Sequence, residues 1–191
     1  MSTKFKRRVV RPQRQKEGAF TLLEALVVVA LLGVLVSLAA PAMMSLQARH
    51  QLEAQAQSFL NSLVLARSEA LRRQKRVSLC AQAAESTCDV NGKWQQGWLV
   101  FVDENSNGTR ETQEALIEVR AALPPSVHLV ATSTVRAYFS YEAEGRSMSV
   151  SGSFMAGSWR FCHASLPQGW QVVSNALGRP RIEKYTPKGC P

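Results

Sequence analysis

The stretch that decides the fold is FTLLEALVVVALLGVLVSLAAPAMM, residues 20–44. It contains one charged side chain, Glu24, and the run from Ala25 to Ala40 is apolar apart from Ser37. A helix needs about 20 consecutive apolar residues to cross the hydrocarbon core of a bilayer. The stretch therefore predicts a membrane-spanning helix near the N-terminus.

The residues before this stretch are strongly basic. Residues 1–19 supply +6 of the formal net charge of +9, and the remaining 172 residues supply only +3. The basic side chains of this leader are Lys4, Lys6, Arg7, Arg8, Arg11, Arg14 and Lys16, against the single acid Glu17. The positive-inside rule places such an N-terminus in the cytoplasm and the rest of the chain outside. If the leader is removed, an argument for nucleic-acid binding must rest on local clusters of charge.

Three interpretations compete for this N-terminal region. A secretory signal peptide ends in a small-x-small cleavage site, which Ala40-Pro41-Ala42 matches only loosely. A plain membrane anchor leaves Glu24 unexplained, because a charge inside the bilayer costs roughly 2.5–3.5 kcal/mol or more. A carboxylate at that position is by default functional, which favours the third interpretation.

The third interpretation rests on Gly18-Ala19-Phe20-Thr21-Leu22-Leu23-Glu24-Ala25-Leu26, which resembles the class III signal of type IV prepilins and type II secretion pseudopilins. The resemblance implies that a prepilin peptidase cuts between Ala19 and Phe20, that Phe20 becomes the N-methylated N-terminus, and that Glu24 serves filament assembly. The family usually has Gly before the cut, whereas this chain has Ala19. A cut after Gly18 would displace Glu24 by one position.

The resemblance also suggests physical roles for Glu24 and Pro41. In a filament, the amine of Phe20 and the carboxylate of Glu24 on a neighbouring subunit would pair in a medium of low dielectric constant, which removes the cost of burying each alone. Pro41 matches the helix-kinking proline of the family. Because proline removes a backbone hydrogen bond, we expect a kink or a locally melted turn there.

Beyond Met44 the pattern becomes amphipathic, so one long helix is predicted from Leu22 to Gln74. After it come short runs of β-branched and aromatic residues separated by Gly, Asn, Ser and Pro, which is typical of strands and turns. The expected strands are Val77–Cys80, Trp98–Asp103, Ala115–Arg120, Val127–Ala131, Arg136–Tyr141, Met148–Ser151, Ser158–Cys162 and Trp170–Val173. The predicted fold is α+β, a long N-terminal helix packed on an antiparallel β-sheet head, as in pilins.

These patterns divide the chain into five parts. The expected parts are a cleaved leader at 1–19, a membrane or filament-core helix at 20–45, an amphipathic helix half at 46–76, a β-rich head at 77–177 and a basic tail at 178–191.

Four cysteines follow the apolar segment, and none forms a CxxC pair or stands beside a histidine at metal-ligand spacing. Disulfides in an oxidising compartment are therefore favoured over reduced thiols in the cytosol. Three pairings are possible. Cys80 with Cys88 is favoured because the spacing suits a local hairpin, and Cys162 with Cys190 because it would pin the C-terminal tail.

A possible calcium loop lies between two expected strands. Asp103, Asn105, Asn107, Gly108 and Glu114 match the spacing of an EF-hand loop. An EF-hand needs flanking helices, whereas the neighbouring segments are predicted strands, so a hairpin turn rich in Asn and Gly is favoured. A calcium-binding adhesive head remains an alternative.

Three segments, one in the helix, one in the head and one in the C-terminal tail, resemble the FimT/GspH branch of minor pilins and pseudopilins. They are Leu65-Ala66-Arg67-Ser68-Glu69-Ala70, Gly97-Trp98-Leu99-Val100-Phe101-Val102-Asp103 and Gly178-Arg179-Pro180-Arg181. FimT-type minor pilins carry a Gly-Arg-x-Arg motif in the C-terminal tail that binds DNA during natural transformation. Gly178, Arg179 and Arg181 match this motif position by position.

The C-terminal tail is also basic in its own right. Arg179, Arg181, Lys184 and Lys188 stand against Glu183 alone, and guanidinium groups bind phosphates through paired hydrogen bonds. Together with Gly178 they are the predicted DNA-binding residues, although a short basic tail can also be ordinary solvated surface. Tyr185 is the only aromatic residue available for base stacking, so double-stranded DNA is the expected partner.

No catalytic motif is present in the sequence, because His50, His128 and His163 do not fall in a motif with Ser, Cys or a carboxylate. No cofactor is expected. The sequence predicts a minor pilin that is anchored in the bacterial inner membrane with a periplasmic head and then incorporated into an extracellular type IV pilus, where it binds DNA for uptake. Expected partners are the prepilin peptidase and other major and minor pilins. The alternative is a purely structural minor pilin or GspH-like pseudopilin in the priming or tip complex of pilus assembly or type II secretion.

Overall fold

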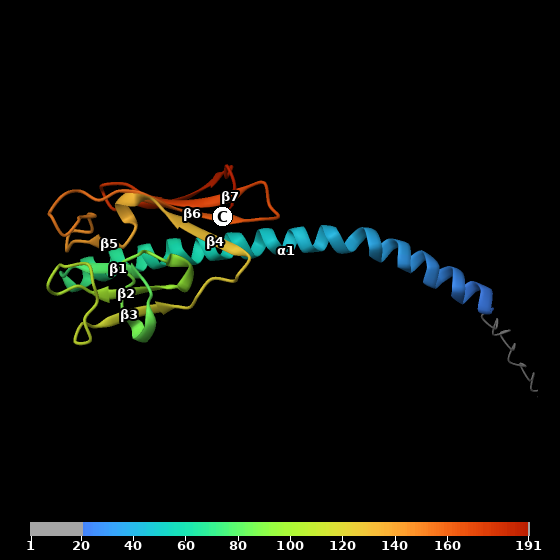
Figure 1. The fold of residues 1–191 in the computed structure, drawn as a ribbon, viewed down its shortest axis with the longest axis horizontal. Helices are drawn as coiled ribbons and strands as arrows, with labels where there is room; N and C mark the ends of the chain where they lie inside the picture. The colour runs from blue at the N-terminus through green and yellow to red at the C-terminus, as the bar shows by residue number, and fades with distance from the viewer. Residues whose placement is uncertain (1–20, 191) are drawn as a thin grey trace, which may run out of the picture. The chain divides into compact units, whose positions relative to one another are not determined.

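The computed structural model describes residues 21–190, so the leader and the expected cut between Ala19 and Phe20 lie outside the described residues. Helix α1 spans Leu22–Arg73 (Figure 1). Thr21 begins it, because its hydroxyl accepts a hydrogen bond of 3.2 Å from the backbone N–H of Glu24. Gln74, with a φ of 53°, ends it in the left-handed conformation common after helices. Both ends agree with the prediction to within one residue.

The N-terminal part of α1 is apolar and exposed. Leu22, Val29 and Val36 are each more than 60% exposed. By length and composition the helix is capable of crossing a membrane. The helix continues without a break across Pro41, so the locally melted turn expected there is not present. The chain divides into two compact units after Ala42, and the second unit, from Met43 onward, contains the head.

The head is antiparallel β, as predicted, and its eight strands form two four-stranded sheets. The first has the order β3-β2-β1-β5 and the second the order β4-β6-β7-β8. The strands are β1 Val77–Ala81, β2 Trp98–Val102, β3 Leu116–Arg120, β4 Val127–Ala131, β5 Tyr138–Tyr141, β6 Gly157–His163, β7 Gly169–Ser174 and β8 Pro180–Tyr185. Short 3-10 helices span η1 Ala84–Ser86, η2 Trp94–Gln96 and η3 Ser133–Val135.

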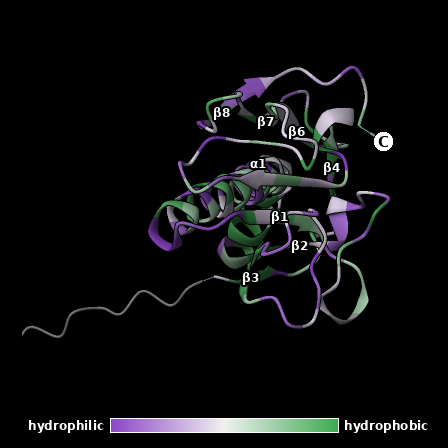
Figure 2. Cartoon of the chain, turned by 90° about the vertical axis from the view of Figure 1, so that its left-hand side faces the viewer, coloured by the Kyte–Doolittle hydropathy of each residue, from purple (hydrophilic) through white to green (hydrophobic). Residues whose placement is uncertain are grey.

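The two sheets lie on opposite sides of α1 (Figure 2). Phe59 of α1 stands between them: its ring centroid is 5.0 Å from that of Trp98 on β2 and 4.9 Å from that of Trp159 on β6. Trp94 and Phe161 also belong to this buried aromatic group, which continues through Phe139 to Tyr141. The helix therefore supplies the centre of one continuous core to which both sheets contribute.

Two expectations about the strands were wrong. Met148–Ser151 is not a strand: residues 142–156 form a loop with isolated bridges, and Val150 within it is half exposed. Conversely, the basic tail, where no strand was predicted, contains β8, which pairs with β7 and brings Ile182 opposite the buried Val172. Ile182 is the one aliphatic residue in the charged segment 181–184, so the segment had no visible apolar alternation.

Candidate functional site

The turn between β7 and β8 holds Arg179 in a defined place. The Asn175 side-chain carbonyl accepts hydrogen bonds from the backbone N–H groups of Leu177 at 3.1 Å and Arg179 at 3.0 Å. The hydroxyl of Ser147 contacts the carbonyl of Asn175 at 3.0 Å. Gly178 has a φ of 70°. The start of the predicted motif is therefore a fixed turn, and the Arg179 side chain is exposed.

The strand that follows sends alternate side chains to opposite faces of its sheet. Ile182 belongs to the inner face, because it pairs with the buried Val172 and packs against the core. Arg181 therefore lies on the outer face, where it forms an ion pair of 3.2 Å with Glu183. Hydrogen bonds, first from Gln171 and then from Arg181, lower the pKa of the Glu183 carboxyl. An incoming anion must compete with this carboxylate for Arg181.

The end of the chain returns over the outer face. The Cys162–Cys190 disulfide joins β6 to the last residues, with Cα atoms 5.7 Å apart. A cleft of about 480 Å³ lies between them, lined by Arg160, Tyr185 and Lys188 among others. Burial raises the pKa of Tyr185, and the positive charge of nearby Arg160 opposes the rise.

The five residues predicted to bind DNA do not lie on one surface. Gly178 and Arg179 form the turn, and Arg181 and Lys188 belong to the outer face. Lys184 pairs with Trp170 on the inner face, and its ammonium lies 5.3 Å from the Trp170 ring centroid. Lys184 is therefore separated from the other predicted cations by the sheet.

Arg160 is an exposed cation of this surface that the sequence analysis missed. It aligns with Gln171 on β7, which in turn aligns with Glu183 on β8. The alternation of apolar and charged residues in Trp159-Arg160-Phe161 could have predicted that Arg160 lies on the outer face, because Trp159 and Phe161 are buried while Arg160 is exposed. We call Arg160, Arg179, Arg181 and Lys188 the basic surface.

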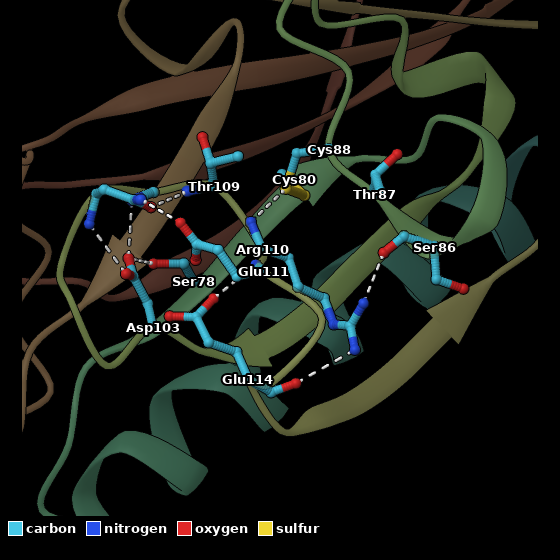
Figure 3. Close-up of a disulfide and its surroundings, with 12 residues drawn as sticks. Ser78, Cys80, Ser86, Thr87, Cys88, Asp103, Thr109, Arg110, Glu111 and Glu114 are labelled. Carbon is cyan, nitrogen blue, oxygen red and sulfur yellow. Dashed lines mark hydrogen bonds between the residues drawn. A yellow bond between two sulfur atoms is a disulfide. The ribbon is translucent and has the colours of Figure 1, made fainter.

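The loop between β2 and β3 contains the residues of the possible calcium site, and it is built around Asp103 (Figure 3). The Asp103 carboxylate accepts hydrogen bonds from the backbone N–H groups of Asn107 and Gly108, both at 3.0 Å, and from the Ser78 hydroxyl at 2.6 Å. The side chain is 1% exposed. Asp103 thus serves as the acceptor that shapes the loop.

Glu114 has the same kind of role at the other end of the loop. One oxygen accepts the backbone N–H of Glu104 at 2.9 Å and the other that of Glu111 at 3.0 Å. Burial raises the pKa of Glu114. The side-chain oxygens of Asn105 and Asn107 also accept backbone N–H groups of the loop. Within residues 21–190 no group of three or more His, Cys, Asp or Glu residues is placed to hold a metal ion.

The first disulfide and Arg110 fasten this loop to its neighbour (Figure 3). Cys80 of β1 is bonded to Cys88, with Cα atoms 5.5 Å apart. The Arg110 guanidinium donates to the carbonyl oxygens of Ser86 at 3.0 Å and Glu114 at 3.2 Å. Both favoured disulfide pairings, Cys80–Cys88 and Cys162–Cys190, are thus present in the structure.

Comparison with protein-family models decides the family. Residues 55–178 match the model of the type II transport protein GspH. The chain belongs to the GspH family. Residues 14–40 match the prokaryotic N-terminal methylation motif, and this range contains the expected cut and Glu24. The two matches cover residues 14–40 and 55–178, so the N-terminal motif and most of the remaining chain are those of a GspH-family protein.

Solved structures confirm the pilin fold of this GspH-family chain. The type IV minor pilin FimU of Pseudomonas aeruginosa superimposes with a TM-score of 0.54 and 17% identity, over 74% of this chain and 96% of FimU. The minor pseudopilin EpsH of the Vibrio cholerae type 2 secretion system gives a TM-score of 0.50 and 15% identity, over 70% of this chain and 96% of EpsH. A comparison with curated protein sequences gives no match.

Proposed function

We propose that this GspH-family chain is a minor type IV pilin that binds extracellular double-stranded DNA through its basic surface, for uptake in natural transformation. The observation that carries the proposal is that Arg160, remote in sequence from the tail, lies with Arg181 and Lys188 on one face of the second sheet, with Arg179 at its end. On that face, Glu183 is the acidic residue that opposes them.

The spacing of the arginines suits a duplex. Arg160 and Arg181 lie two strands and two residues apart, which by ordinary sheet spacings places their Cα atoms about 12 Å from each other. The major groove of B-DNA is about 12 Å wide. Side chains from these two positions can therefore reach phosphates on both sides of a groove, and each guanidinium can bind a phosphate through two hydrogen bonds.

The proposed path to the pilus begins at the N-terminus. The prepilin peptidase cuts between Ala19 and Phe20, and Phe20 is methylated. Before assembly, α1 anchors the chain in the inner membrane with the head in the periplasm. In the filament, Glu24 pairs with the Phe20 amine of a neighbouring pilin subunit, since a buried carboxylate and a buried amine each need a partner.

The proposal is tested by titrating the full chain, in a non-ionic detergent with both disulfides formed, against a labelled duplex over a salt series. Phosphate contacts make affinity fall with salt, and each lost contact lowers the slope of log K against log salt by about one. The double variant Arg179→Ala, Arg181→Ala should therefore bind more weakly, with a slope lower by about two.

Lys184→Ala is the matched control, because it removes a cation from the same strand on the opposite face. It should leave the slope unchanged, while Arg160→Ala should lower it. If the disulfide-intact chain binds no DNA, the alternative holds: a structural minor pilin or pseudopilin in the priming or tip complex of pilus assembly or type II secretion.

A further inference from the structure

A second pocket opens on the inner side of the sheet that bears the basic surface. Its volume is about 320 Å³, within the range of small-molecule sites. Arg49, Leu52 and Glu53 line it from α1, and Trp170 and Lys184 line it from β7 and β8. All of these residues belong to the head unit that begins at Met43.

The charged groups of this pocket are not neutralised by ion pairs within the part of the chain that the structure describes. Arg49, Glu53 and Lys184 are exposed and form no ion pair with any of the residues 21–190. The Lys184 ammonium lies over the face of Trp170, 5.3 Å from the ring centroid. The pocket thus presents two cations, one carboxylate and an apolar floor that includes the buried Leu52 and Leu166.

The pocket lies just beyond the apolar stretch of α1. Arg49 follows Met44, the last residue of the apolar stretch, by five residues of the same helix, a rise of about 7.5 Å. The headgroup layer of a bilayer is roughly 5–7 Å thick on each side of the hydrocarbon core. When α1 spans a membrane with Met44 at the edge of the hydrocarbon core, the Arg49 backbone therefore lies at the outer edge of the headgroup layer, and the long side chain can reach the lipid headgroups.

Trp170 reinforces this assignment. It is half-buried, whereas Trp94, Trp98 and Trp159 are at most 1% exposed in the core. Tryptophan favours the membrane–water interface, where its ring is in apolar surroundings and its N–H remains hydrated. Trp170 is thus the tryptophan placed to meet a membrane surface.

We propose that this pocket binds the headgroup of a zwitterionic aminophospholipid while the chain is still anchored in the membrane. The lipid phosphate lies between Arg49 and Lys184, and the primary ammonium of the headgroup pairs with Glu53. The contact holds the base of the head against the bilayer before assembly and is given up when the subunit enters the filament. This site is independent of the DNA-binding proposal, because it lies on the opposite side of the sheet.

The test uses fluorescence of the full chain in phosphatidylcholine vesicles that contain a nitroxide-headgroup lipid and either phosphatidylethanolamine or phosphatidylglycerol. The signal of Trp170 is the difference between the chain and its Trp170→Phe variant. We expect the nitroxide to quench Trp170 with phosphatidylethanolamine present. Arg49→Gln and Lys184→Gln should each lose most of this quenching, and Glu53→Gln should lose the advantage of phosphatidylethanolamine over phosphatidylglycerol.

Arg146→Gln is the control, because it removes an exposed cation in the loop 142–156, outside the pocket; it should leave the quenching unchanged. Equal quenching in the unaltered chain and in the Arg49 and Lys184 variants would overturn the proposal, since tethering by α1 alone would then explain the proximity. Stronger quenching with phosphatidylglycerol would also overturn it, because simple attraction to anionic lipid would suffice.

Discussion

The indole N–H of Trp98, on β2, donates a hydrogen bond of 2.9 Å to the hydroxyl of Ser62 in the middle of α1. Ser62 is fully buried, and its hydroxyl in turn donates to the Glu118 carboxylate of β3. A polar group in a helix face that is otherwise apolar thus links the helix to two strands of the first sheet.

Ser62→Ala should destabilise the head by about 1–3 kcal/mol, because it leaves the buried Trp98 N–H without an acceptor. Urea denaturation of the disulfide-intact chain in detergent measures the loss. Ser68→Ala is the control: its hydroxyl is exposed and bonds only the Leu65 carbonyl, so the change should be within about 0.5 kcal/mol. Equal stability of the two variants would contradict a structural role for the link.

Asp103→Asn should destabilise the head by about 1–3 kcal/mol whether calcium or a chelator is present. The two oxygens of the Asp103 carboxylate accept three hydrogen bonds. In asparagine an N–H₂ group, which cannot accept, replaces one of these oxygens. Glu104→Gln, an exposed change in the same loop, should have little effect. A rise in the melting temperature of the unaltered chain on adding calcium would instead support the calcium-binding alternative.

Gly178→Ala should both destabilise the chain and weaken DNA binding. A Cβ there would lie 2.6 Å from the Gly145 carbonyl oxygen and 2.8 Å from Tyr141 Cε1, so the turn carrying Arg179 must shift. Gly152→Ala separates the steric clash from the backbone strain, because Gly152 has a similar φ of 79° but open space around its Cβ position. It should show only the backbone cost of about 1 kcal/mol and unchanged DNA affinity. Both are read from urea denaturation and the duplex titration.

Replacing Cys162 and Cys190 by serine should cost about 3–4 kcal/mol, the chain-entropy value for a 28-residue separation. The last residues are then no longer held over the outer face, so Lys188 should contribute less to DNA binding and the salt slope should fall by about one. The corresponding Cys80 and Cys88 double variant should leave that slope unchanged, because its disulfide lies in the other sheet. The duplex titration over salt compares the two variants.

The end of α1 should lose stability in acid through Glu69. Hydrogen bonds, first from Arg72 and then from Arg73, lower the pKa of Glu69 from 4.5 to about 2. The resulting stabilisation is fully present above pH 4.5 and is lost as the pH falls from 4.5 toward 2. Glu69→Gln should remove this part of the pH dependence, which urea denaturation between pH 2 and 5 measures. An unchanged acid transition in the variant would assign the loss to other carboxyl groups.

The sequence by itself determined the apolar segment, the long helix, the family and most of the strands. The apolar stretch and Glu24 are patterns along one dimension, and Thr21 and Gln74 mark the helix ends by local geometry. The segments β1, β2 and β4 were predictable because β-branched and aromatic residues are concentrated there. None of these features depends on which remote segment packs against it.

The tertiary structure alone decided how the basic residues are shared between surfaces. Strand β8 exists because Ile182 is packed inward opposite Val172, a contact invisible in the charged segment itself. Its pairing with β7 sends Arg181 outward and Lys184 inward, and the pairing of β6 with β7 places Arg160 on the same outer face as Arg181. The side chains of a strand alternate between two faces, so only the register with a neighbouring strand determines which charges act together.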